Sequence, residues 1–188
     1  PLNNPDNPIE MLYGQMIHYA QKYLYIMTPY LILDHEMESA ITHAAKSGID
    51  VRLILPHIPD KKYAYMVAET YWGELLEHGV KIYKYTPGFI HAKSVLVDRE
   101  VALIGSTNMD YRTFQLHCEC SVLFYGMPVI EELLEDMDRI MEQSALYTMD
   151  PSSVSLAPTA KRWLKSGSTN CSKTIIVSPA HPNLTTRR

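Results

Sequence analysis

The sequence predicts an α/β domain in which helices flank a mixed β-sheet. Strand-like and helix-like segments alternate over the first 85 residues, which is typical of layered α/β domains. After residue 87, short strands follow one another without helices between them, which favours antiparallel neighbours in the same sheet. Of the 188 residues, 46% are hydrophobic and 20% are charged. These are ordinary values for a globular chain, so disorder throughout is excluded.

The first elements are indicated by capping residues and by the spacing of apolar positions. Asn7 and Pro8 predict the N-cap and first position of a helix. Its apolar positions recur at helical spacing, at Ile9, Leu12, Tyr13, Met16, Ile17 and Ala20. A strand is expected over 24–28. Asp34 predicts the N-cap of a second helix, which Gly48 ends.

The remaining elements follow in chain order. Residues 51–55 form an apolar run, as expected for an interior strand of an α/β sheet. The further expected elements are a helix over 60–78 and strands over 80–85, 90–97, 101–104 and 119–125. Pro128 then predicts the start of a last helix. Its apolar side consists of Ile130, Leu133, Leu134, Met137, Ile140 and Met141.

A change of composition divides the chain into a domain over 1–150 and a tail over 151–188. The tail contains 12 Ser or Thr and four Pro, with little periodicity, and we expect it to be flexible. It carries six basic and no acidic residues, so the formal charge of −4 leaves −10 on the first 150 residues. An acidic body argues against binding of nucleic acid over a broad surface.

Several absences limit the class of protein. No apolar run approaches the roughly 18 residues needed to span a bilayer. The chain opens with Pro1 and carries no signal peptide, so we expect it to be part of a longer protein. The three cysteines, Cys118, Cys120 and Cys171, do not form a disulfide framework, and buried thiols in a reducing compartment are expected. No cluster has the spacing of a metal site, so neither a metal nor a cofactor is expected.

The chemistry is indicated by one motif of six residues with the pattern HxK(x)4D(x)6GSxN. Its members are His91, Lys93, Asp98, Gly105, Ser106 and Asn108. Average residue frequencies give such a pattern by chance on the order of once in a million chains of this length. A histidine can attack or donate a proton near neutral pH, and a lysine can hold a phosphate. The motif therefore indicates phosphoryl transfer.

Strand geometry assigns roles within the motif. Residues two apart in a strand face the same way, so His91 and Lys93 are expected to share a face. Asp98 lies on the opposite face, and we interpret it as structural, bonding to the turn at 99–100. Gly105 allows close approach of the backbone.

The phosphate is expected to be held without a metal. Ser106 and Asn108 are positioned to donate hydrogen bonds to its oxygens, and Lys93 supplies positive charge for the transition state.

The histidine needs a partner on its second ring nitrogen to fix the tautomer. Glu119 is the best candidate, because it lies on a neighbouring predicted strand. The other histidines of the domain have no matched partners and are interpreted as surface or core residues: His18, His35, His43, His57, His78 and His117. The aromatic segment from Tyr63 to Trp72 could line a lipid-facing groove, although its helical spacing favours a place in the core.

The stretch from Phe89 to Phe124 resembles the His-Lys-Asp (HKD) motif of the phospholipase D superfamily. The wider context resembles the C-terminal half of bacterial cardiolipin synthases over about residues 5–148. This context is Thr28-Pro29-Tyr30, Gly88 to Lys93, and Gly105 to Arg112. The resemblance implies a phospholipase D-like layered domain, with Glu119 as the acidic residue that orients the histidine. Asp110 and Arg112 match the pattern and are expected to support the loop.

The resemblance also implies the reaction and its partners. Two HKD motifs build one site, in which one histidine forms a phosphohistidine and the other protonates the leaving alcohol. Two phosphatidylglycerol molecules would give cardiolipin and glycerol at a membrane surface, on the cytoplasmic face of the bacterial inner membrane. This chain has no second HxK pattern. A second HKD domain is therefore expected, either as the N-terminal half of the full-length enzyme or as a second copy in a homodimer.

Two alternatives remain at this stage. One is a homodimeric phosphodiesterase, either a phospholipase or a nuclease. The other is a non-enzymatic scaffold or lipid-binding module, which the complete motif makes the weakest.

Overall fold

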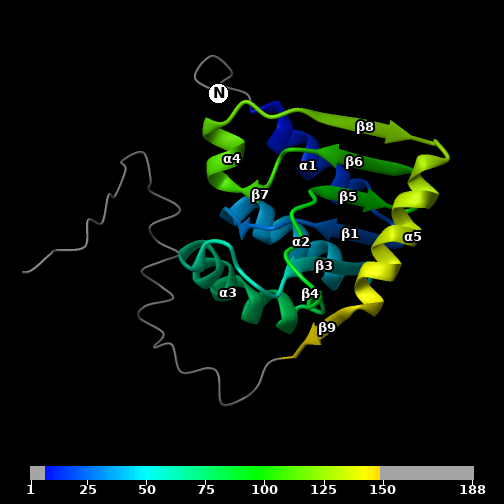
Figure 1. Cartoon of the computed structure of the whole chain (residues 1–188). Helices are drawn as coiled ribbons and strands as arrows, with labels where there is room; N and C mark the ends of the chain where they lie inside the picture. The colour runs from blue at the N-terminus through cyan, green and yellow to red at the C-terminus, as the bar shows by residue number, and fades with distance from the viewer. Residues whose placement is uncertain (1–6, 149–188) are drawn as a thin grey trace, which may run out of the picture.

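A seven-stranded mixed sheet forms the centre of the protein, which we describe from a computed structural model over residues 7–148 (Figure 1). In order across the sheet, the strands are β8 (Ser121–Tyr125), β6 (Val101–Gly105), β5 (Ser94–Val97), β1 (Tyr23–Met27), β3 (Asp50–Pro56), β4 (Lys81–Tyr85) and β9 (Ser144–Tyr147). Strands β1, β3 and β4 are parallel, and the remaining pairs are antiparallel. The predicted mixed α/β fold class is confirmed.

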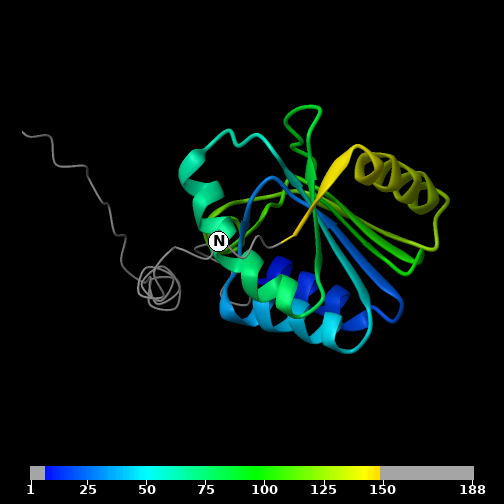
Figure 2. The same ribbon diagram turned by 90° about the horizontal axis from the view of Figure 1, so that it is seen from below.

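Helices cover both faces of this sheet (Figure 2). On one face lie α1 (Pro8–Tyr19), α2 (His35–Lys46) and α3 (Lys62–Glu77), and on the other lies α5 (Val129–Glu142). A short helix, α4 (Tyr111–Leu116), lies beyond one end of the sheet. Next to it, β2 (Leu31–Ile32) and β7 (Met109–Asp110) form a separate parallel pair.

The period-two pattern of β1 shows how the sheet holds these layers together. Leu24 and Ile26 are buried against the core formed with α1, α2 and α3, whereas Tyr25 and Met27 are buried against α5. Because both faces are covered, the central strands consist almost entirely of apolar residues, as the sequence of β3 predicted. The sheet is thereby a rigid platform for the loops at its ends.

Two predicted strands are shorter in the structure than in the sequence analysis. The strand expected over 90–97 begins only at Ser94, and the one expected over 119–125 begins only at Ser121. The reason is the length of their partners: β1 ends at Met27, opposite Ser94, and β6 ends at Gly105, opposite Ser121. Residues 90–93 and 118–120 therefore lie in loops at the end of the sheet.

The predicted helix caps have mixed outcomes. Asp34 caps α2 as predicted, because its side chain accepts a hydrogen bond from Met37 N at 2.8 Å. Asn7 occupies the N-cap position of α1, but its side chain does not cap the helix. It donates instead to the carboxylate of Glu10. A further cap was missed: Asp110 accepts from Thr113 N at 2.7 Å and starts α4, a helix too short to show periodicity.

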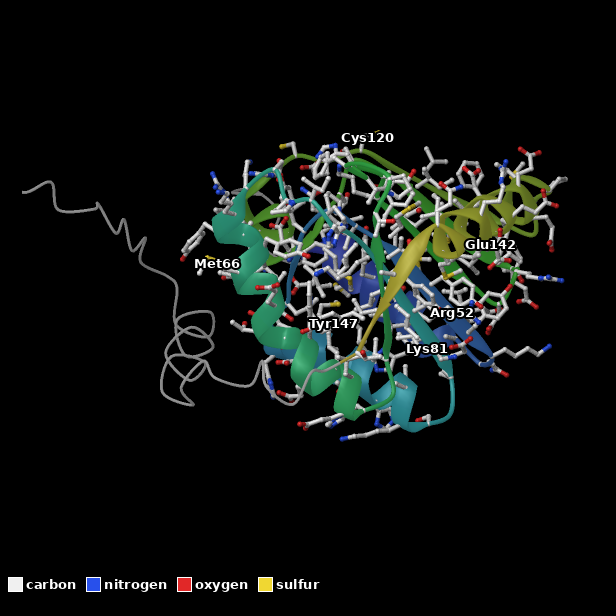
Figure 3. All side chains as sticks on the ribbon, turned by 60° about the horizontal axis from the view of Figure 1, so that its bottom comes forward. Arg52, Met66, Lys81, Cys120, Glu142 and Tyr147 are labelled. Carbon is white, nitrogen blue, oxygen red and sulfur yellow. The ribbon has the colours of Figure 1, made fainter. Side chains whose placement is uncertain are left out.

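The expectation of buried thiols is wrong for Cys118 and Cys120, which are exposed free thiols in the loop that precedes β8. Figure 3 shows Cys120 at the surface. Cys171 and the predicted tail over 151–188 lie outside the described residues, so the domain boundary stays a prediction. Within residues 7–148, no helix is both long enough and apolar enough to cross a membrane.

A half-buried carboxyl joins α1 to the start of α2. Burial raises the pKa of Glu10 to about 8, and a hydrogen bond with Asp34 and the charge of Glu36 act in the same direction. A hydrogen bond from Gln115 Nε2 at 3.0 Å opposes the shift. Glu10 is therefore protonated in the folded domain up to weakly alkaline pH.

This protonation makes the stability of the domain depend on pH. The pKa of Glu10 is higher in the folded state than in the unfolded chain, so its contribution is complete below about pH 4.5 and is lost as the pH rises through about 8. We expect the free energy of unfolding, measured by urea titration at pH 5 to 9, to decrease over this range. Glu10→Gln should flatten the dependence, whereas Glu77→Gln at the end of α3 should not. Parallel curves for Glu10→Gln and the wild type would contradict this assignment.

Candidate active site

Residues of the motif gather at one end of the sheet (left in Figure 1). His91 and Lys93 lie just before β5, residues 105–108 follow β6, and Glu119 precedes β8. The antiparallel order places these ends together: Gly105 N donates to Lys93 O at 3.2 Å, and Ser106 N donates to Cys120 O at 2.9 Å. The parallel strands β1 and β3 end at the same edge, which is where α/β sheets bind their ligands.

His91 and Lys93 form a contact pair at this edge. Lys93 Nζ lies 3.0 Å from His91 Nδ1 and also donates to His91 O at 2.5 Å. The imidazole is exposed and contacts two aromatic rings, with centroid distances of 5.5 Å to Phe89 and 6.4 Å to Tyr30. The two side chains thus lie together, as their spacing predicted, although they lie in a loop and not in a strand.

The electrostatics around Lys93 combine burial with two carboxylates. Partial burial holds the pKa of Lys93 below its ordinary value, and the negative charges of Glu119 and Asp60 offset only part of this shift. These carboxylates favour the ammonium form at this site. A fixed cation beside an exposed imidazole is suited to binding a phosphate ester.

Ser106 and Glu119 also lie together. The Ser106 hydroxyl donates to a Glu119 carboxylate oxygen and accepts from Cys120 N at 3.0 Å. The other oxygen of Glu119 lies 3.3 Å from His117 Nδ1. Glu119 and His91 form no direct hydrogen bond or ion pair in the described chain. That Glu119 orients His91 therefore stays a prediction.

At Gly105 the chain at the start of β8 leaves no room for a side chain on β6. A Cβ atom at this position would overlap Ser121 Oγ and Cys120 O. No larger residue fits without separating the two strands. The close approach that the sequence predicted for Gly105 is present, and it sets the position of Ser106.

Asn108 is held by the β2–β7 pair and by α4. Its Nδ2 donates weakly to Thr113 Oγ1 at 3.3 Å, and its Oδ1 is buried with no partner. The backbone beside it is fixed by Thr28, whose hydroxyl accepts from Met109 N at 3.2 Å. Asn108 thus lies at the site but has spare hydrogen-bonding capacity.

Asp98 lies at the opposite end of the sheet, after β5. Its carboxylate accepts hydrogen bonds from the backbone N–H groups of Gln21, Lys22 and Tyr23 at 2.6 to 2.8 Å. Its structural bonds therefore go to the start of β1, and not to the turn at 99–100 that we expected. The reason is the antiparallel pairing of β5 with β1, which brings the end of one strand to the start of the other.

Sequence reasoning missed three side chains of the site. Tyr30 lies beside His91 and donates to Asp60 Oδ2 at 2.5 Å, and His117 contacts Glu119. Asp60 had no sequence signal, because it comes from the loop between β3 and α3. The signals for the others were weak: Tyr30 ends the Thr-Pro-Tyr segment, and His117 lies two residues before Glu119.

The fold and these side chains define the class of protein as phospholipase D-like. Among solved structures, the phospholipase D family member Nuc of Salmonella typhimurium has a TM-score of 0.67 at 22% identity, over 77% of this chain and 94% of that one. Phosphatidylserine synthase of Haemophilus influenzae has a TM-score of 0.62 at 18% identity, over 88% and 43% of the two chains. NucT of Helicobacter pylori has a TM-score of 0.61 at 17% identity, over 78% and 94%.

Sequence comparison narrows the class to one family. The model of the PLD-like domain of cardiolipin synthase matches residues 13–141, and the chain belongs to this family. Cardiolipin synthase 2 of Bacillus anthracis is 43% identical over 149 residues, which are 78% of this chain and 29% of that protein. An uncharacterized protein of Streptococcus mutans is 44% identical over 139 residues, which are 74% and 30% of the two. The chain thus spans about 30% of the length of these relatives.

The requirement for glycine at position 105 is testable by substitution. Gly105→Ala should lower the free energy of unfolding by about 1–3 kcal/mol, because the added methyl group separates β6 from β8. The matched control is Gly88→Ala, where a Cβ atom meets nothing within 4 Å. The measurement is urea denaturation followed by circular dichroism. Equal stability of the two variants would contradict the close approach.

Proposed function

We propose that this chain is one catalytic half of a phosphatidyl transferase that makes cardiolipin and glycerol from two phosphatidylglycerol molecules. The observation that carries the proposal is the contact of Lys93 with His91 beside Ser106, in a chain of the cardiolipin synthase family. A second HKD motif completes the site, from an N-terminal half or from a second copy. The enzyme works at the membrane surface, on the cytoplasmic face of the bacterial inner membrane.

The reaction proceeds in two displacements at phosphorus. In the first displacement, one histidine attacks the phosphate of the first lipid through Nε2. The bond from phosphorus to the oxygen of the headgroup glycerol breaks, and the other histidine protonates this leaving glycerol. The terminal hydroxyl of the second lipid then attacks the phosphohistidine, and the bond from phosphorus to Nε2 breaks. The attacking hydroxyl gives its proton to the other histidine, so both histidines return to their starting states. His91 takes one of these two roles and the second motif takes the other.

Lys93 changes partners during this cycle. With the ammonium donating, His91 Nδ1 is an acceptor and Nε2 carries the ring hydrogen. Attack by Nε2 needs the opposite tautomer, with Nδ1–H donating to an acceptor. The observed contact of Lys93 with His91 is therefore the arrangement without substrate. When a phosphate binds, its oxygens attract Lys93 away from His91. Asn108 donates to the same oxygens, and Ser106 does so once its single hydroxyl hydrogen turns from Glu119 to the phosphate. Together with Lys93 they stabilise the charge of the transition state.

Glu119 acts on this site through its charge and its bonds. It holds Ser106 in place, and its carboxylate favours the ammonium form of Lys93. When Lys93 moves to the phosphate, Glu119 is the acidic residue of the motif available to receive a hydrogen bond from His91 Nδ1. This is the orienting role that the family resemblance implies.

A homodimeric phosphodiesterase is the second candidate function. It is favoured by the matches to Nuc and NucT, which extend over 94% of those chains, so a domain of this size can make up almost a whole chain. The charge of −10 on the first 150 residues weighs against a nucleic acid substrate. The lipid transfer reaction therefore remains the first proposal.

His91 is the direct test of the proposed chemistry. In the completed enzyme, His91→Asn should lower both glycerol release and cardiolipin formation from phosphatidylglycerol vesicles by roughly 1,000-fold or more. The variant should unfold at the same temperature as the wild type, because the side chain is exposed. His43→Asn, an exposed histidine of α2, is the control and should retain full activity. Activity of His91→Asn near the wild-type level would refute the role.

Glu119 is tested by the pH dependence of turnover. Glu119→Gln removes the negative charge of the carboxylate, which raises the pKa of Lys93 in the wild type. We therefore expect the alkaline limb of the pH–rate profile to move to lower pH, with turnover at pH 7 lower by about 10-fold or more. Glu135→Gln on α5 serves as the control. A loss of rate with no movement of the alkaline limb would show that Glu119 only holds Ser106.

A further inference from the structure

An open groove of about 340 Å³ lies beside the catalytic edge, between the start of α3 and α4. Its lining residues include Tyr30, Lys61, Tyr63, Asn108, Arg112 and His117. This volume is within the range of sites for small molecules. Neither the His91–Lys93 pair nor the motif at 105–106 lines it, so it is a separate compartment.

The groove is nevertheless continuous with the phosphoryl-transfer site. Tyr30 borders both, because it lines the groove and its ring lies 6.4 Å from that of His91. Asn108 also borders both, as a motif residue whose Oδ1 has no partner. A molecule in the groove can therefore extend an attached group to the reacting phosphorus.

Two cations line this groove on a domain that is otherwise acidic. Lys61 and Arg112 are exposed, and neither forms an ion pair with another described residue. Lys61 lies over the Tyr30 ring, with Nζ 5.5 Å from the centroid. The acidic residue of the lining, Asp110, is buried and satisfied by Thr113 as the cap of α4. The groove thus offers unpaired positive charge to an anion.

The helices on either side of the groove carry exposed apolar side chains. Tyr63 and Met66 on α3 are 75% and 60% exposed, and Leu116 on α4 is 62% exposed. Figure 3 shows Met66 projecting from α3 at the surface of the molecule. Cations together with exposed apolar groups fit the headgroup and glycerol backbone of a phospholipid better than a polynucleotide.

We propose that this groove binds the acceptor phospholipid, with Arg112 and Lys61 holding its phosphodiester anion. The inference rests on the function proposed above and names the subsite for the second substrate. In the product, two phosphates are separated by one glycerol. The acceptor phosphate must therefore lie one glycerol away from the reacting phosphorus, and the groove adjoins the His91–Lys93 pair through Tyr30. The terminal hydroxyl of the acceptor then attacks the phosphohistidine past Asn108.

The subsite is tested by comparing two acceptors of the same intermediate. Exchange of deuterated glycerol into phosphatidylglycerol uses an acceptor without a phosphate, whereas cardiolipin formation uses one that has a phosphate. Both reactions are measured by mass spectrometry on the active form of the protein. This form is either the chain alone or the chain together with a segment that carries the second HKD motif. Lys61→Ala/Arg112→Ala should lower cardiolipin formation about 10-fold or more, because charge-assisted hydrogen bonds are lost. Glycerol exchange should stay within about two-fold.

The controls separate this subsite from a general defect. Arg112→Lys should recover part of the cardiolipin formation lost in Arg112→Ala, and Arg139→Ala on α5 should change neither reaction. Equal loss of both reactions in the double variant, or loss of neither, would overturn the acceptor subsite. A wild-type protein that catalyses neither reaction in any form would instead refute the proposed function, and this inference with it.

Discussion

The antiparallel pairing of β5 with β6, beside β1, is the constraint on which the site depends. Its register places Ser94 opposite Ile104 and also opposite Met27 of β1. The residues just before β5 and just after β6 are thereby adjacent at one edge of the sheet. His91 and Lys93 come from the first segment and Ser106 and Asn108 from the second, so one pairing register assembles the groups of the proposed phosphoryl-transfer site.

The same register explains why the six-residue motif contains both structural residues and candidate catalytic residues. Asp98 follows β5 at the far end and fixes the start of β1 through three backbone N–H groups, which secures the pairing from the side away from the chemistry. Gly105 secures the near side by allowing β8 to approach β6. Asp98 and Gly105 thus stabilise the strand pairing, whereas the imidazole of His91 is exposed and accessible to a substrate.

Much of this fold was predictable from the sequence because both faces of the sheet are buried. Strands such as β3 are apolar runs, and α2 is marked by the cap at Asp34. The ends of β5 and β8 were not predictable, because they depend on where the partner strands stop. The aromatic segment from Tyr63 to Trp72 has two roles that the sequence could not separate, because they depend on tertiary packing. Tyr71 and Trp72 are core residues, while Tyr63 lines the groove. The contacts of Tyr30 with Asp60 and His91 join segments that only the fold brings together.

The central claim is that this chain supplies half of a phosphatidyl transfer site. Its most direct test measures glycerol release and cardiolipin formation from phosphatidylglycerol vesicles, with the mass of the protein in solution determined in parallel. The account predicts turnover only when two HKD motifs are present, either in a dimer of this chain or after addition of a segment that carries the second motif. Turnover by a monomer with His91 as its one motif histidine would contradict it, and so would the absence of turnover in both combinations.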